Sequence, residues 1–242
     1  MIRKIPVIGV IGLLLSTIGS PVNGQCEKDC SQKETCFEKL FDGESTKGWR
    51  GYQKDHVPSR WVVEDGTLHF NPTETGDRGD IIFDKTFANF HLKLEWKIAE
   101  KGNSGIFYLG SEDSNYHAIY QTAPEMQVLD NERHPDAKLG KDGNRKSGSL
   151  YDLIPAVPQN CKPAGEWNQV EVIHKDGHVI HWMNGEKVVE YQAGAEEWDE
   201  LVAGSKFPGL NPNWANLATE GYIGLQDHGD KVWYRNIQIM EL

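Results

Sequence analysis

Basic side chains are scarce in this chain of 242 residues, which has 25 Lys and Arg against 36 Asp and Glu and a formal net charge of −11 at pH 7. Nucleic acids and anionic membranes need basic surface, so the charge balance argues against both as partners. The sequence also lacks a Gly-rich phosphate loop, a nucleophile elbow and a metalloprotease helix motif, which leaves those three enzyme classes without support. We find no internal repeat and no convincing pattern of a long helix.

Long hydrophobic runs are missing too, apart from one at the N-terminus. Residues 5–18 are almost all apolar, follow Arg3 and Lys4, and lead to small residues before Gln25. This is the pattern of a signal peptide over residues 1–24, and the run is too short for a comfortable membrane span. We therefore expect an exported protein, periplasmic or extracellular, without stable membrane insertion. The mature chain keeps 23 basic and 36 acidic residues, a net charge of −13.

Cysteine is sparse, with four residues at positions 26, 30, 36 and 161. A metal site built from His and Cys needs denser pairing than this spacing offers. In an exported protein a disulfide is the default. We therefore expect a disulfide that joins Cys161 to Cys36 or one of its neighbours.

Strand patterns dominate the rest of the chain. Residues 90–98 alternate cleanly between apolar and charged side chains, as in a strand with one buried face. Asp-Gly or Asn-Gly dipeptides at 65–66, 176–177 and 184–185 predict two-residue hairpins. Further strands are expected at residues 60–64, 67–70, 80–83, 106–109, 125–129, 167–175, 178–183, 186–191, 221–226 and 232–242.

Two long segments without strand character interrupt this series, at residues 130–166 and 192–220. Long loops in a compact domain are usually functional. Many short strands with tight turns predict an all-β fold, a jelly-roll sandwich of two antiparallel sheets. We expect one such domain over residues 37–242, after a polar, Cys-containing tail at 25–36.

The chain is rich in aromatic residues, with eight Trp and eight Tyr. Flat aromatic faces stack on pyranose rings, so an acidic, exported, aromatic-rich chain suits a sugar ligand. The alternative is that these side chains fill a β core.

The C-terminal stretch carries the first candidate site. Gln226, Asp227 and His228 lie between two predicted strands. If the first strand continues to His228, alternation places Gln226 and His228 on one face and Asp227 on the other. A nearby carboxylate favours the imidazolium and orients the ring, so we expect Asp227 to support His228. The alternative is a polar hairpin loop.

Further candidates come from the middle of the chain. Glu125 and Gln127 share one face of a strand, and an acid beside an amide suits a carbohydrate site; an exposed outer face is the alternative. Asn103 stands at a strand entrance, where its amide points into a groove or forms a turn. Arg145 and Lys146, near Tyr151 in the first long loop, are candidates for holding an oxyanion, with solvated side chains as the alternative, and we expect Arg145 and Tyr151 to bind substrate.

Taken in order, several segments resemble the 3-keto-disaccharide hydrolase domain family, a concanavalin A-like sandwich group. They are LFDGESTKGW (40–49), NSGIFYLG (103–110), PEMQVLDN (124–131), SGSLYDLIP (147–155), GEWNQVEVIHKDGHVIHWMNGEKVVEY (165–191) and GYIGLQDHGDKVWYRNIQIMEL (221–242). The resemblance implies a jelly roll whose concave face binds sugar, and action on glycosides oxidised to a ketone at C3. It also implies that Glu125, Gln127, Gln226, Asp227 and His228 line the cleft.

A C3 ketone acidifies the proton on C2, so a base can remove it and the C1 oxygen can then be expelled. This elimination needs a base, an acid at the leaving oxygen, and donors or a cation at the enolate. We expect His228, supported by Asp227, as the base and Glu125 as the acid or a metal ligand, with Gln127 and Gln226 orienting hydroxyls. A divalent metal ion is one group that would hold the enolate. The sequence decides neither this requirement nor whether water is added afterwards.

Two alternatives remain at this stage. One is a non-catalytic carbohydrate-binding module with the same sandwich. The other is an ordinary glycosidase, which needs two carboxylates flanking C1. The sequence offers only one convincing carboxylate on a sheet face, Glu125, and this favours elimination.

Overall fold

The structure is a computed structural model, and it describes residues 36–242. The expected signal peptide at 1–24 and nearly all of the tail at 25–36 lie outside the described residues. The elements are β1 (Glu38–Lys39), β2 (Trp49–Gly51), β3 (Trp61–Glu64), β4 (Thr67–Phe70), β5 (Ile81–Phe87), β6 (Phe90–Ile98), β7 (Asn103–Gly110), η1 (Ile119–Gln121), β8 (Glu125–Leu129), η2 (Pro135–Lys138), β9 (Asn168–Lys175), β10 (His178–Met183), β11 (Glu186–Gln192), α1 (Glu196–Ala203), η3 (Phe207–Gly209), β12 (Gly221–Leu225) and β13 (Val232–Glu241).

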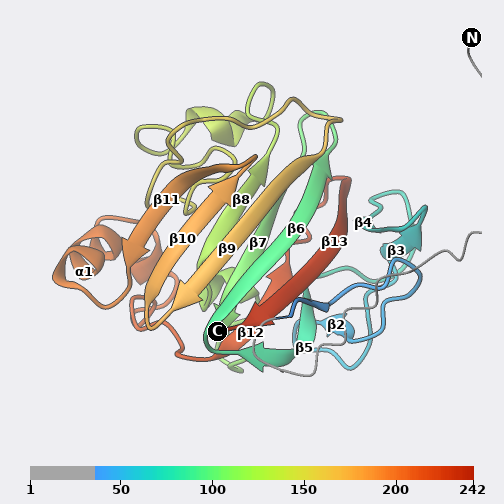
Figure 1. The fold of residues 1–242 in the computed structure, drawn as a ribbon, viewed down its shortest axis with the longest axis horizontal. Helices are drawn as coiled ribbons and strands as arrows, with labels where there is room; N and C mark the ends of the chain where they lie inside the picture. Colours follow the sequence, from blue (N-terminus) through green and yellow to red (C-terminus); the bar gives the residue numbers. More distant parts are fainter. Residues whose placement is uncertain (1–35) are drawn as a thin grey trace, which may run out of the picture. The chain divides into compact units, whose positions relative to one another are not determined.

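The strands form two antiparallel sheets, seen one behind the other in Figure 1. The larger sheet has the order β11-β10-β9-β6-β13-β4-β3, with β1 paired to β13. The smaller sheet has the order β2-β5-β12-β7-β8. The predicted all-β sandwich is therefore confirmed.

The core lies between the two sheets because each strand presents alternate side chains to it. In β6 the apolar positions from Phe90 to Ile98 are buried, while the charged positions between them are partly exposed. The three predicted hairpin dipeptides adopt positive φ at both residues, for example 50° at Asp65 and 72° at Gly66. These are the angles of a type I′ turn, which matches the twist of the flanking strands.

The structure differs from the sequence prediction in several places. Strand β5 runs to Phe87, beyond the predicted 80–83, and the short strand β2 was not predicted. The segment 192–220 contains α1, an eight-residue helix. Cys161 carries a free thiol, so the expected disulfide to it is wrong, and Cys36 is disulfide-bonded elsewhere.

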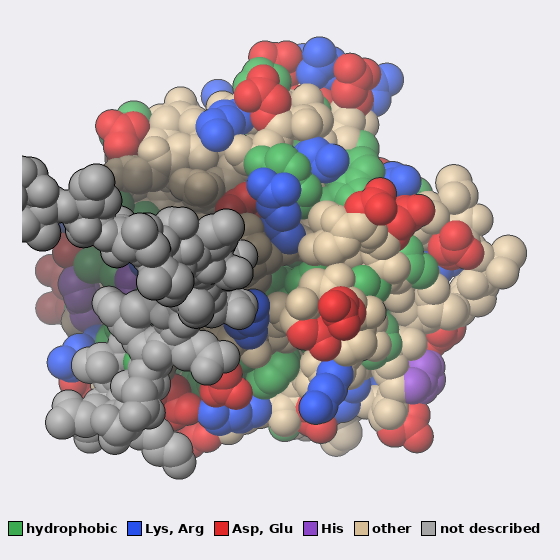
Figure 2. All heavy atoms as spheres, turned by 45° about the vertical axis from the view of Figure 1, so that its right-hand side comes forward, with side chains coloured by type: hydrophobic (Ala, Val, Ile, Leu, Met, Phe, Trp, Pro, Cys, Tyr) green, Lys and Arg blue, Asp and Glu red, His purple; other side chains and the backbone are tan. Residues whose placement is uncertain are grey.

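Within the described residues, no helix is long and apolar enough to cross a membrane. On the face seen in Figure 2, acidic and basic side chains are interspersed and no basic patch gathers.

The outer face of the smaller sheet, turned away from the larger sheet, creates the space for a site. Two glycines on this face, Gly105 and Gly224, leave the strands β7 and β12 without side chains there. A Cβ at Gly224 would lie 2.8 Å from Cδ1 of Ile119, so η1 packs directly onto the backbone. Ile119 belongs to a small second core with Tyr52, Ile82, Phe107 and Ala123, which covers one end of the face. The other end remains open.

Candidate active site

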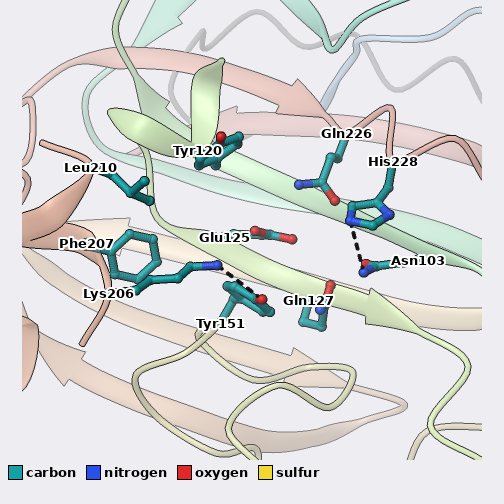
Figure 3. Close-up of a pocket in the computed structure, with 10 residues that line it drawn as sticks. All are labelled: Asn103, Tyr120, Glu125, Gln127, Tyr151, Lys206, Phe207, Leu210, Gln226 and His228. Carbon is teal, nitrogen blue, oxygen red and sulfur yellow. Dashed lines mark hydrogen bonds between the residues drawn. The ribbon is translucent and has the colours of Figure 1, made fainter. Parts of the chain in front are cut away.

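A cavity of about 300 Å³ occupies the open end of the smaller sheet's outer face. Its walls come from β7, η1, β8, the loop after β8, the segment after α1, and the end of β12 (Figure 3). The lining residues are Asn103, Tyr120, Glu125, Gln127, Tyr151, Lys206, Phe207, Leu210, Gln226 and His228. The expected shared cleft of Glu125 and His228 is therefore present, although β7 separates their strands.

Strand register explains why distant residues meet here. Gly105 of β7 pairs with Gln127 of β8, and Leu225 of β12 pairs with Ile106. Cross-strand partners point to the same face, so Gln226, Gly105 and Gln127 form one row across the sheet. The missing side chain at Gly105 leaves room for the carboxyl group of Glu125, which lies over that backbone.

Replacing Gly105 with alanine is expected to displace this carboxyl group. The added Cβ would lie 2.2 Å from Oε1 of Glu125, closer than atoms can approach. A misplacement of about 1 Å at a reacting group can cost on the order of 100-fold in rate. We expect such a loss of kcat with a small change in melting temperature. Gly204→Ala is the matched control, because its Cβ would meet its neighbours at an ordinary 3.6 Å. Equal activity of the two variants would contradict the placement of Glu125.

Glu125 is a buried acid, with 5% of its surface exposed. Burial raises its pKa to about 8, and the nearby ammonium of Lys206 opposes this rise. Among the described residues, no donor lies within hydrogen-bond distance of the carboxylate to favour its charged form. Glu125 is therefore protonated at neutral pH and able to donate a proton.

His228 stands across the cavity with its side chain 48% exposed. The amide Nδ2 of Asn103 donates to its Nε2 at 3.4 Å (Figure 3). An amide nitrogen is always a donor, so Nε2 accepts and the neutral ring carries its hydrogen on Nδ1. Nδ1 faces Oδ2 of Asp230 at 3.8 Å. The Nε2 lone pair is thus engaged by the long hydrogen bond from Asn103, and it acts as a base at the cavity once that bond opens.

Asp227 does not support His228, and this expectation is corrected. Its side chain is 1% exposed and accepts from Nη2 and Nε of Arg78 at 2.9 and 3.0 Å, and from the backbone N–H of Gly79 at 2.8 Å. Its own N–H donates to Oδ1 of Asp80 at 2.9 Å. Asp227 therefore anchors the chain that carries Gln226 and His228, and Asp230 is the carboxylate nearer the imidazole.

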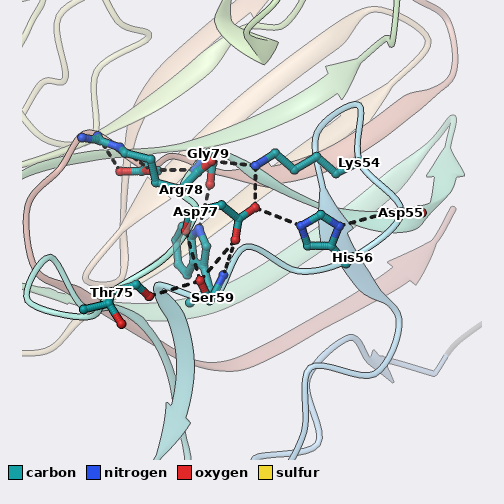
Figure 4. A network of polar contacts seen from close by, with 10 residues as sticks. Lys54, Asp55, His56, Ser59, Thr75, Asp77, Arg78 and Gly79 are labelled. Carbon is teal, nitrogen blue, oxygen red and sulfur yellow. Dashed lines mark hydrogen bonds and ion pairs between the residues drawn. The ribbon is translucent and has the colours of Figure 1, made fainter.

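The loop that presents Arg78 is itself held in place by a polar network (Figure 4). The carboxylate of Asp77 accepts from Nζ of Lys54 at 2.8 Å and from the backbone N–H of Ser59 at 3.0 Å, and it lies 2.9 Å from Nε2 of His56. Hydrogen bonds from Lys54 and Ser59 hold the pKa of Asp77 well below its usual range. The contacts that hold the loop carrying His228 in place therefore run through Asp227, Arg78 and Asp77 to residues 54–59.

The expected role of Arg145 at the site is also corrected. Its Nε donates to Asp152 at 2.6 Å and its Nη1 to Asp136 at 3.0 Å, so its charge is already paired. Arg145 does not line the cavity, whereas Tyr151 from the same loop does. Arg145 braces this loop because it joins two acidic residues within it.

Three amide groups of the lining carry unpaired atoms. Oδ1 of Asn103, Nε2 of Gln127 and Oε1 of Gln226 are buried and have no hydrogen-bond partner among the described residues. A buried unpaired polar atom is costly, so such a cluster calls for an occupant that pairs with it. Two acceptors and one donor match the hydroxyl groups of a sugar.

His134, His228 and Asp230 form a group whose ligand atoms lie within 4.8 Å of one another. A metal ion needs a nitrogen lone pair from each histidine. Nδ1 of His134 accepts from the backbone N–H of Asp136 at 3.1 Å, so its neutral ring carries the hydrogen on Nε2. Metal binding through Nε2 would need that hydrogen to move to Nδ1, which already faces the Asp136 N–H, so the present arrangement does not fit a metal ligand.

Sequence reasoning did not identify the wall formed by Lys206, Phe207 and Leu210, nor Tyr120 and Asp80. The first three lie in the segment 192–220, where no periodicity indicates which side chains turn inward. Asp80 lies directly before β5, its Oδ1 accepts from the backbone N–H of Asp227 at 2.9 Å, and burial raises its pKa to about 7. Its place as the first residue of the strand predicted at 80–83 was the only available indication.

A two-sheet sandwich with an acid, a base and unpaired amides in one cavity is the arrangement of a carbohydrate-processing enzyme. Residues 36–240 match the 3-keto-alpha-glucoside-1,2-lyase-like domain, and the chain belongs to this family. It is 50% identical to a 3-keto-disaccharide hydrolase of Bacteroides thetaiotaomicron over 84% of this chain and 77% of that protein. The recognised family and the expected enzyme are thereby confirmed.

Solved structures support the same conclusion. A candidate glycosyl hydrolase of Parabacteroides distasonis aligns with a TM-score of 0.77 and 34% identity, over 85% of this chain and 94% of that one. A second from the same organism has a TM-score of 0.68 and 26% identity, over 86% of this chain and 100% of that one.

Proposed function

We propose that this enzyme cleaves the glycosidic bond of 3-keto-glycosides by abstraction of the C2 proton and elimination at C1. The observation that carries the proposal is the pair facing each other across one cavity: a buried, protonated Glu125, and a His228 whose unprotonated Nε2 is engaged only by a long hydrogen bond of 3.4 Å from Asn103. In the proposal Glu125 serves as the acid and His228 as the base. The name of the Bacteroides thetaiotaomicron relative supports a 3-keto-disaccharide as the substrate class.

In this mechanism His228 takes the proton from C2, and the electron pair of that bond forms an enolate with its charge on the C3 oxygen. The enolate then restores the ketone and forms a double bond between C1 and C2. The C1–O bond breaks, and the leaving oxygen takes a proton from Glu125. Addition of water to the unsaturated product gives net hydrolysis, as the relative's name implies.

The amides of Asn103, Gln127 and Gln226 pair with the hydroxyl groups of the sugar in this proposal. Their unpaired atoms are buried, so they discriminate strongly against a ligand that lacks matching groups. Tyr120 and Phe207 supply the apolar surface on which a pyranose ring stacks.

An ordinary glycosidase mechanism is less well supported. Retaining and inverting enzymes need two carboxyl groups beside the scissile bond, roughly 5–5.5 or 6.5–9.5 Å apart. Among the residues that line the cavity within the described part of the chain, Glu125 is the only carboxylic acid. A binding module, the other alternative, has no need of an acid facing a base.

Incubation of the protein with a 3-keto-glucoside and with its unoxidised parent tests the proposal. We expect release of the aglycone from the first only, because the parent sugar lacks the ketone that acidifies C2. Deuterium at C2 should slow the reaction if proton abstraction limits the rate. Cleavage of both sugars at similar rates would identify an ordinary glycosidase, and binding of the keto sugar without turnover would identify a module.

A further inference from the structure

The cations around the cavity differ in whether their charge is already paired. Arg145 is bound to Asp136 and Asp152, and Arg78 is bound to Asp227. Lys206 lines the cavity, and within the described part of the chain no carboxylate lies within 4.0 Å of its Nζ. Lys206 is therefore the cation that remains available to a ligand.

The segment after α1 fixes Lys206 in this position. The neighbouring Phe207 stacks on Trp214 with ring centroids 3.9 Å apart, and Trp214 stacks on Trp198 of α1 at 5.9 Å. Trp198 in turn stacks on Tyr191 of β11 at 5.1 Å. This column of rings joins the segment to the larger sheet, so the backbone at Lys206 is anchored by packing.

Tyr151 holds the ammonium group itself. Nζ of Lys206 lies 4.3 Å from the centroid of the Tyr151 ring and donates to its hydroxyl oxygen at 3.2 Å (Figure 3). A cation over an aromatic face is stabilised as a cation. One ammonium hydrogen is used in the bond to Tyr151, and two remain for a ligand in the cavity.

We propose that the ammonium group of Lys206, positioned by Tyr151, binds the C3 oxygen of the substrate and stabilises the negative charge that develops on it. This inference rests on the proposed function and supplies the cation that the elimination requires. Protonated Glu125 does not neutralise Lys206, so the positive charge stays effective until the enolate forms. A fixed charge that meets charge developing in the transition state lowers the barrier.

No bond to Lys206 forms in this step. The C2 proton goes to the base, the electron pair moves to the C3 oxygen, and one of the two remaining ammonium N–H groups donates to that oxygen. A neutral lysine would act differently, by attacking the C3 ketone to give an imine and water. Burial lowers the pKa of Lys206, whereas the position of its Nζ over the Tyr151 ring favours the ammonium form, and experiment separates the two routes.

The test compares Lys206→Met, Lys206→Arg and Lys206→Ala with the wild type and with Lys138→Met, an exposed lysine outside the cavity. The readouts are kcat on a 3-keto-glucoside, the rate of C2 deuterium exchange, and the melting temperature. Loss of a single group that stabilises an oxyanion costs about 10²–10³-fold in kcat. We expect this loss in Lys206→Met, partial activity in Lys206→Arg, and rescue of Lys206→Ala by added ethylammonium. Lys138→Met should behave as the wild type.

The outcomes separate this inference from the proposed function. If the wild type cleaves the keto sugar and Lys206→Met cleaves it equally fast, the inference is wrong while the proposed function stands. If the wild type does not cleave it, the proposed function fails first. Borohydride treatment that traps a covalent substrate adduct on Lys206 would overturn the ammonium role. If Lys206→Met fails to fold, the rescue of Lys206→Ala and the activity of Lys206→Arg test the ammonium role instead. Failure of ethylammonium to rescue Lys206→Ala would count against the inference.

Discussion

Replacing His228 with alanine is expected to lower kcat on a 3-keto-glucoside about 10²–10⁴-fold, the usual cost of removing a general base. The side chain is half exposed and its hydrogen bond to Asn103 is long, at 3.4 Å. Its removal therefore takes little from the packing of the sandwich, and the melting temperature should stay within a few degrees. Enzyme kinetics and thermal unfolding of the same preparation provide the measurement.

His117→Ala is the matched control, because His117 is exposed and does not line the cavity. It should leave both kcat and melting temperature unchanged. A hairpin role for His228 predicts the opposite pattern, with a lower melting temperature and normal kcat per folded molecule. A folded His228→Ala protein with near-normal kcat would remove His228 from the mechanism.

The strands were predictable because the information for them is local. Alternation in residues 90–98 and the turn dipeptides each specify structure within a few residues. Gln226 and His228 reach the cavity as alternation predicts, with Asp227 turned away from them. Residues of β8 and of the end of β12 share one cavity because β7 alone separates these strands in the sheet, so strand order accounts for their proximity.

The partners of charged residues were not predictable in the same way. Asp227 is paired with Arg78, 149 positions earlier in the chain, and no local pattern links the two. Arg145 is neutralised by acids only seven and nine positions away, but their meeting depends on an irregular loop. Lys206 enters the cavity from a segment whose path is set by stacked aromatic rings. The strands therefore followed from periodicity, whereas the electrostatics of the site required the tertiary structure.

Replacing Glu125 with glutamine is expected to lower the activity without lowering the stability of the protein. Gln has nearly the same shape but is not an acid, so kcat on a keto sugar with a poor leaving group should fall about 10²–10⁴-fold. A keto sugar whose leaving group needs no proton should lose much less. Glu197→Gln, an exposed position on α1, is the control and should leave both substrates unaffected.

The same substitution should stabilise the protein at alkaline pH. The pKa of Glu125 rises from the ordinary 4.5 to about 8 in the folded state because the side chain is buried. Between these values the folded protein holds a proton that the unfolded chain has released, so the free energy of unfolding falls as pH rises. Its slope is at most about 1.4 kcal/mol per pH unit for one proton. Gln does not titrate and escapes this loss.

Thermal and urea unfolding of the wild type and of Glu125→Gln provide the measurement, at several pH values between 5 and 9. The free energies of unfolding of the two proteins should differ more as the pH rises. The variant should gain stability relative to the wild type through the window up to about pH 8, and the difference should level off above it. The wild-type kcat should decline over the upper part of this range, because the proton-donating form of Glu125 is lost there. A stability difference that does not change with pH would show that Glu125 is ionised in the folded protein at neutral pH, and it could then not be the acid.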